Sequence, residues 1–112
     1  MFQINNIGKM CLTRGDTCEF TIELFNEDGT PFEPSAHDVV LFSIKKNLND
    51  ENSLLEKTGL IIRIESEDTK DLPIATYYYD IKILFEDGSV QTVIPSNFFE
   101  LKYNVGDWDA EN

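Results

Sequence analysis

The sequence predicts an all-β fold built from antiparallel hairpins, on the strength of two observations. The first is a strand-and-turn pattern that occurs twice without a gap, at 20–29 and 79–88. In both copies apolar and polar residues alternate until the run ends in Glu-Asp-Gly, which is typical of a strand entering a tight two-residue turn. The second is that no segment of ten or more residues carries apolar side chains at helical spacing. About eight short strands with turn signals between them favour a β-sandwich or barrel.

The first strands are separated by a glycine turn. A short apolar run at 7–12 is expected to form the first strand, and Gly15 permits the turn at 13–16. The run 18–25 then alternates strictly, so it is expected to be a strand with one buried face. That face consists of Phe20, Ile22 and Leu24.

The middle of the chain alternates between strands and turn-rich segments. Two prolines make 31–37 an edge segment or a loop, and the polar segment 47–53 is expected to be a mobile loop. Strands are expected at 38–46 and 60–65, because apolar residues alternate there. The short segment 54–57 is ambiguous between one helical turn and a strand.

The longest expected strand is 75–86, with its return strand after the Asp-Gly turn at 87–88. A two-residue turn would pair Phe85 with Val90, Ile83 with Thr92 and Ile81 with Ile94. All of these side chains then fall on one buried face. The segment 95–97 is expected to be a short corner before a final strand at 98–105.

Length and composition predict one globular domain over 1–112, with a core at about 7–105 and a tail at 106–112. The hydrophobic content of 41% is that of a folded chain. No run approaches the ~20 apolar residues that span a bilayer, and the N-terminus lacks the features of a signal peptide. We therefore expect synthesis in a cytoplasm, without membrane insertion.

The net charge of −12 comes from 21 acidic and 9 basic residues. Such a surface repels phosphate backbones and anionic membranes, so we expect no nucleic-acid partner. The acidic residues are dispersed, which is sufficiently explained by solubility. The alternative is that these acidic residues bind a basic partner or calcium.

Two cysteines, Cys11 and Cys18, are the only ones in the chain. If 13–16 closes a hairpin, the two would face each other and a cross-strand disulfide would be conceivable. We favour free, half-buried thiols, because the chain looks intracellular in origin and small apolar cysteines are common in cores. The first two strands of a sandwich can also lie in different sheets.

No catalytic constellation is visible. His37 is the only histidine, and it lies in a polar loop. A nucleophile-elbow motif is absent, and two cysteines with one distant histidine match no zinc spacing. Carboxylates are too many for any pair to be singled out as glycosidase acids. The expectation is a protein that is not an enzyme and that has no cofactor and no metal.

Several aspartates lie in expected loops, where calcium takes its ligands. They are Asp16, Asp28, Asp38, Asp68 and Asp87. None belongs to an EF-hand string, and Asp before Gly is first of all a turn residue. The tripeptide at 14–16 reads Arg-Gly-Asp, as in integrin ligands, but the turn accounts for it without adhesion.

Aromatic residues supply the candidate partner-binding side chains. Tyr78 is expected to point away from the core, next to Asp80, while its two neighbours point inward. Tyr103 and Trp108 lie near the C-terminus, and Trp108 sits in a polar segment. Exposed Tyr and Trp beside carboxylates are used both by protein interfaces and by sugar sites. The alternative is that these aromatic residues only take part in the ordinary packing of the core and its rim.

The order of these motifs resembles a known family. The chain reads L-T-R-G-D-T at 12–17, F-T-I-E-L at 20–24, D-G at 28–29, V-V-L-F-S-I-K-K at 39–46, E-D-T at 67–69, Y-Y-Y-D-I-K-I at 77–83 and D-G-S-V-Q-T-V-I at 87–94. This order is similar to the small N-terminal domain of phage baseplate upper proteins, and to stand-alone phage or prophage proteins. The resemblance extends over roughly 7–105.

The resemblance implies an antiparallel immunoglobulin-like β-sandwich of about seven to eight strands. It also implies a non-enzymatic virion structural or assembly protein of the tail or baseplate, which binds other phage structural proteins or itself. The alternative function is a carbohydrate-binding β-sandwich module that recognises cell-surface glycans.

Overall fold

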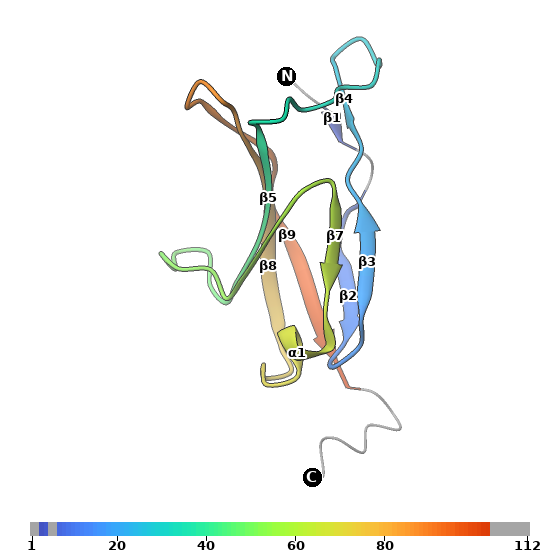
Figure 1. Cartoon of the computed structure of the whole chain (residues 1–112). Coiled ribbons are helices and arrows are strands. Elements are labelled where there is room, and N and C mark those ends of the chain that lie inside the picture. The colour runs from blue at the N-terminus through green and yellow to red at the C-terminus, as the bar shows by residue number, and fades with distance from the viewer. Residues whose placement is uncertain (1–2, 5–6, 104–112) are drawn as a thin grey trace.

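The computed structural model describes residues 3–4 and 7–103 and shows a mostly β fold (Figure 1). The expected all-β class is confirmed. In chain order the elements are β1 (Gln3–Ile4), β2 (Met10–Thr13), β3 (Cys18–Thr21), β4 (Leu24–Phe25), β5 (Val39–Lys45), β6 (Leu55–Thr58), β7 (Ile61–Ile64), α1 (Ser66–Thr69), β8 (Thr76–Leu84) and β9 (Val90–Lys102). The ambiguous segment 54–57 thus belongs mainly to a strand, β6.

The largest unit is a five-stranded sheet in the order β2-β9-β8-β5-β6. Its strands are antiparallel except for the pair β2 and β9, where Met10 stands opposite Phe99 in a parallel register. The expectation of a purely antiparallel fold is therefore wrong at this edge. The reason is the turn after β2, which carries the chain into β3 in another sheet and leaves β2 to pair with the last strand.

A second layer lies opposite the large sheet (Figure 1). It contains the antiparallel pair β3 and β7, while β1 pairs with β4. The expected strand at 18–25 is interrupted between β3 and β4, where the Ile22 amide donates to the Leu60 carbonyl at 2.6 Å. Its two faces are nevertheless as expected, because Ile22 and Leu24 are buried and Phe20 packs against the core.

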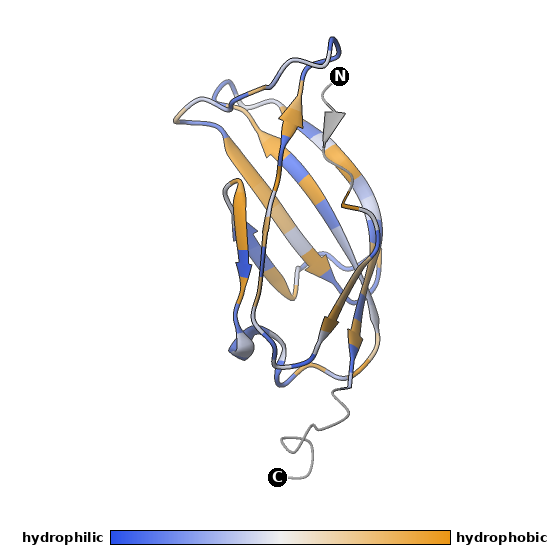
Figure 2. Cartoon of the chain, turned by 90° about the vertical axis from the view of Figure 1, so that its right-hand side faces the viewer, coloured by the Kyte–Doolittle hydropathy of each residue, from blue (hydrophilic) through white to orange (hydrophobic). Residues whose placement is uncertain are grey.

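The core fills the space between the two layers. Phe42 of β5 is fully buried, with its ring 5.5 Å from that of Phe20 and 5.6 Å from that of Tyr79. Figure 2 shows the alternation of hydrophobic and hydrophilic residues along the strands that produces this arrangement. The buried hydrophobic residues are Ile22, Leu24, Val40, Phe42, Ile44, Ile62, Ile64, Tyr77, Tyr79, Ile81, Ile83, Phe99 and Leu101.

Both Glu-Asp-Gly turns are one residue longer than expected. In the second copy Phe85 donates to the Ser89 carbonyl at 2.8 Å, and Gly88 donates back to Phe85 at 2.9 Å. Within this loop only Gly88 has a positive φ, of 92°, and no described non-glycine residue has one. This is a three-residue hairpin loop with glycine at the left-handed position. The pairings of Phe85 with Val90 and of Ile83 with Thr92 are therefore wrong, because Leu84 stands opposite Val90 and Lys82 opposite Thr92.

Two irregularities in β9 leave a single pair in the expected register. Ile81 stands opposite Ile94, as expected, after a register shift between this pair and the pair Lys82–Thr92. A second shift precedes Tyr79, so Asp80 has no partner in the β9 ladder. The expected corner at 95–97 is wrong, because β9 runs through it. Pro95 has no backbone N–H, so a bulge is a position that a strand proline tolerates.

The connection into β8 is fastened by a tyrosine. Tyr77, at the start of β8, is buried and its hydroxyl donates to the Pro73 carbonyl at 2.6 Å. The one-turn helix α1 precedes this connection, and the Asp68 carboxylate at its start accepts from the Glu65 amide at 2.7 Å. Among the described residues, no helix has the length and apolar character needed to cross a membrane.

Candidate interaction surface on the five-stranded sheet

The five-stranded sheet has one face against the core and one face turned away from it, which we call the outer face. Alternation along β5 and β8 buries every second residue and turns the intervening side chains outward. The outer face is formed by Cys11, Thr13, Val39, Leu41, Ser43, Lys45, Glu56, Thr58, Thr76, Tyr78, Asp80, Lys82, Leu84, Val90, Thr92, Phe98, Glu100 and Lys102.

Apolar side chains lie at both ends of this face. At one end Val39, Leu84 and Val90 stand opposite one another on three adjacent strands, and Val39 and Val90 are exposed. At the other end the rings of Tyr78 and Phe98 pack together with their centroids 5.7 Å apart, and Phe98 is 47% exposed. Exposed apolar groups that lie together on a sheet face are available for contact with a partner.

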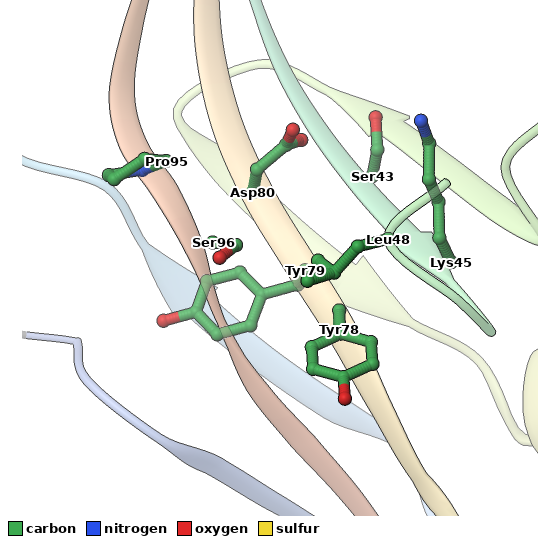
Figure 3. Close-up of a pocket in the computed structure, with 8 residues that line it drawn as sticks. All are labelled: Ser43, Lys45, Leu48, Tyr78, Tyr79, Asp80, Pro95 and Ser96. Carbon is green, nitrogen blue, oxygen red and sulfur yellow. The ribbon is translucent and has the colours of Figure 1, made fainter. Parts of the chain in front are cut away.

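Asp80 lies between the two apolar ends, at the β9 irregularity. A pocket of about 90 Å³ opens here, lined by Ser43, Lys45, Leu48, Tyr78, Tyr79, Asp80, Pro95 and Ser96. Figure 3 shows the side chains of Asp80, Ser43 and Lys45 extending in the same direction. In the register, Ser43 of β5 is the direct neighbour of Asp80.

One oxygen of the Asp80 carboxylate lacks a donor. Its Oδ1 atom is buried, and no hydrogen bond from the described part of the chain reaches it. The Oδ2 atom lies 3.9 Å from Nζ of Lys82, and the Asp80 side chain is 22% exposed. Burial raises the pKa of Asp80 above its usual value, although Lys82 and Lys45 act in the opposite direction. A buried carboxylate oxygen without a donor lowers the stability of the folded chain.

The charges of the outer face balance. Three lysines, at 45, 82 and 102, are matched by three carboxylates, at 56, 80 and 100. The outer face therefore carries no net charge, whereas the chain as a whole carries −12.

A second pocket opens between the layers, beside the β2 edge. Its volume is about 310 Å³, and it is lined by Ile7, Met10, Cys11, Leu12, Cys18, Phe20, Thr21, Ile64 and Phe99. Both cysteines are free thiols and lie in different sheets, so the hairpin disulfide does not form. Cys18 is half-buried as expected, but Cys11 is exposed, with its Sγ atom 3.8 Å from Oε1 of Glu100.

The aromatic residues expected to bind a partner do not form one cluster. Tyr78 lies on the outer face, as the alternation predicts, at the same end as Phe98. Tyr103 follows the end of β9, is 65% exposed and has the Arg14 guanidinium carbon 5.6 Å from its ring centroid. Trp108 lies outside the described residues. Phe98 was missed, although the alternation through the buried Phe99 could have placed it on the outer face.

The turn aspartates fasten their own loops. Oδ1 of Asp87 accepts from the Ser89 amide at 2.8 Å and from its hydroxyl at 2.6 Å, and Asp28 makes the same two bonds to Thr30. These bonds lower the pKa of both carboxyls. Within 3–4 and 7–103, no group of three or more His, Cys, Asp or Glu residues is placed to hold a metal ion.

The other residues considered for binding or catalysis lie in a loop and in a turn. His37 is exposed in the loop before β5. The Arg-Gly-Asp tripeptide forms the turn after β2, where the Asp16 amide donates to Thr13 at 3.0 Å. The Gly15 amide donates to the buried Thr69 hydroxyl at 2.9 Å, so this turn is packed against α1.

No protein-family model matches the chain, and no curated protein matches it significantly. A function therefore has to be inferred from the surface and the fold of the chain itself.

Proposed function

We propose that this chain is a non-enzymatic phage or prophage virion protein, associated with the tail or baseplate, that works through protein–protein contacts. The observation that carries the proposal is the outer face, where exposed apolar residues lie at both ends of the sheet. Apolar groups of this kind supply binding energy when a partner covers them.

The proposal includes an immunoglobulin-like sandwich of the variable type. The order β9-β8-β5-β6 corresponds to strands G, F, C and C′ of that fold, and β3 pairs with β7 as B pairs with E. The hydrogen bond from Tyr77 to Pro73, at the start of β8, corresponds to the tyrosine corner at the start of strand F. Such sandwiches serve as modules in many assemblies, so the fold itself is compatible with the proposed role.

Three of the seven segments behind the phage resemblance lie in the large sheet. The segment 39–46 comprises β5, and 77–83 lies within the central strand β8. The segment 87–94 forms the turn and the start of β9. The resemblance thus includes three neighbouring strands that carry most of the outer face, together with segments outside this sheet such as 20–24 and 67–69.

A carbohydrate-binding module remains the alternative, favoured by Tyr78 beside the pocket at Asp80. An aromatic ring next to a carboxylate and a serine is a combination that sugar sites use. Binding on a glycan array that is lost in Tyr78→Ala would favour this alternative. A blank array, with and without calcium, would remove it.

Mass spectrometry of purified particles tests the proposed location directly. Induction of the source strain should yield particles whose peptides include this chain, at a stoichiometry fixed relative to the other tail proteins. Immunogold labelling should then place it at the tail end. Particles that lack the chain would contradict the virion assignment.

A further inference from the structure

We infer that the pocket between β2 and β3 binds an extended strand of another protein, with apolar residues at alternate positions and basic residues between them. The pocket opens between the two layers, at the side of the molecule, and not on the outer face. The inference therefore goes beyond the proposed function and does not require a virion role.

The core is incompletely covered on the side where β2 and β3 lie. The large sheet ends there in β2, whose side chains Met10 and Leu12 line the pocket and are only partly buried. Phe20 of β3 is also partly exposed, whereas Ile62 and Ile64 of the neighbouring β7 are at most 1% exposed. Among the described strands, β3 pairs only with β7, so its other edge is open.

The open edge of β3 offers backbone hydrogen-bonding groups. The Ile22 amide donates to the Leu60 carbonyl, on the side of β7, and backbone groups alternate in direction along a strand. The amide and carbonyl of Glu19 therefore point away from β7, and no described strand pairs with them. An edge of this kind can accept a further strand through main-chain hydrogen bonds.

The pocket beside this edge selects apolar side chains. No charged residue is among those that line it, which are Ile7, Met10, Cys11, Leu12, Cys18, Phe20, Thr21, Ile64 and Phe99. Its volume of about 310 Å³ is about twice the roughly 150 Å³ of a cavity that holds one benzene ring, so it can take about two large apolar side chains. Side chains two positions apart on a strand point to the same side, so an extended segment can fill the pocket with every second residue.

The outward residues next to the open edge determine the charge of the partner. Glu19 and Thr21 are exposed, and Glu23 follows at the same spacing and is exposed too. The Glu19 carboxylate lies 3.5 Å from Arg63 of β7, but 55% of the Glu19 side chain remains exposed. A strand added beside β3 would place its own outward side chains next to these carboxylates, where opposite charges are favoured. The net charge of −12 also attracts a basic segment.

The test measures binding of a synthetic peptide, Lys-Ile-Lys-Ile-Lys-Ile-Lys, to the full chain by fluorescence anisotropy. One control peptide contains the same residues grouped in two blocks, and a second contains glutamate in place of lysine. The alternating basic peptide should bind roughly ten-fold more tightly than either control, because only this peptide combines the spacing with the charge.

Two variants test the position of the peptide. Glu19→Lys should weaken the binding of the basic peptide roughly ten-fold and strengthen that of the acidic one. The matched control is Glu51→Lys, which makes the same charge change at an exposed position in the loop before β6, the strand at the opposite edge of the large sheet. This control should bind like the wild type. Cys18→Phe fills the pocket and should abolish binding, while the thermal midpoint stays the same or rises.

Amide hydrogen exchange separates strand addition from other modes of binding. The bound peptide should slow exchange at the Glu19 amide roughly ten-fold, because this amide gains a main-chain acceptor. Unchanged exchange at Glu19, equal binding of the alternating and block peptides, or equal effects of the two lysine variants would overturn the inference. A Glu19 amide that is already protected in the free chain, with no peptide bound, would also overturn it, because the chain would then fill the pocket itself. None of these results decides whether the chain is part of a virus particle, so the two proposals fail separately.

Discussion

Replacing Asp80 with valine should stabilise the folded chain. The substitution removes a carboxylate whose buried Oδ1 atom receives no hydrogen bond from the described residues. An unsatisfied buried acceptor of this kind costs about 1–3 kcal/mol. The lost ion pair with Lys82, at 3.9 Å and with both side chains partly exposed, contributes at most about 0.5 kcal/mol. Valine is also favoured over aspartate in a central strand. We therefore expect a gain of about 1–2 kcal/mol at pH 7.

The gain should depend on pH with a defined sign. Burial raises the pKa of Asp80 in the folded state, so the folded chain binds this proton more tightly than the unfolded chain does. This tighter proton binding stabilises the wild type in full below the pKa that Asp80 has in the unfolded chain. The stabilisation is lost as the pH rises through the pKa that Asp80 has in the folded chain. The advantage of Asp80→Val is therefore largest at neutral pH and shrinks toward acid.

Urea unfolding followed by far-UV circular dichroism measures this difference, at pH 7 and again at about pH 3.5. A gain of this size corresponds to a thermal midpoint raised by roughly 4–10 °C. Asp71→Val is the matched control, because it removes the same charge from an exposed position. The reasoning is refuted if Asp80→Val is no more stable than Asp71→Val at pH 7, or if its advantage grows toward acid.

Three further outcomes follow from the fold. Tyr77→Phe should lower the free energy of unfolding by about 1 kcal/mol in urea titrations, because the hydrogen bond to Pro73 is lost; an unchanged midpoint would argue against that bond. Gly88→Ala should cost about 1 kcal/mol in the same assay through backbone strain alone, since no atom lies within 4 Å of the added Cβ. Alkylation of the native chain followed by mass spectrometry should label Cys11 faster than Cys18, and a disulfide-linked mass would contradict the structure.

Strand faces were predictable from the sequence because they depend only on local alternation. The buried and outward residues of β8 follow the period of two without exception, so Tyr78 could be placed on the outer face. Turn length was not predictable in the same way. Asp-Gly suits both a two-residue turn and a three-residue loop with glycine in the left-handed region, and the structure contains the latter at Gly29 and Gly88.

Local sequence patterns also could not predict which distant segments pair with each other. Nothing near Met10 indicates that its strand pairs in parallel with the last strand, because that choice depends on which edge remains open after the other strands are in place. The irregularities of β9 could not be predicted from local patterns either. They leave Asp80 without a partner in the β9 ladder, and so the sequence predicted the neighbourhood of the site through Tyr78 but not the Asp80 oxygen that lacks a donor.

The parallel pairing of β2 with β9 has a consequence for biosynthesis. Met10–Thr13 emerges from the ribosome long before its partner residues, Phe99–Lys102. The five-stranded sheet therefore cannot be completed until this distant segment has been synthesised, and the pairing of β2 has to wait for it. Pairings between segments so far apart in the sequence form slowly, and they leave apolar side chains uncovered in the meantime.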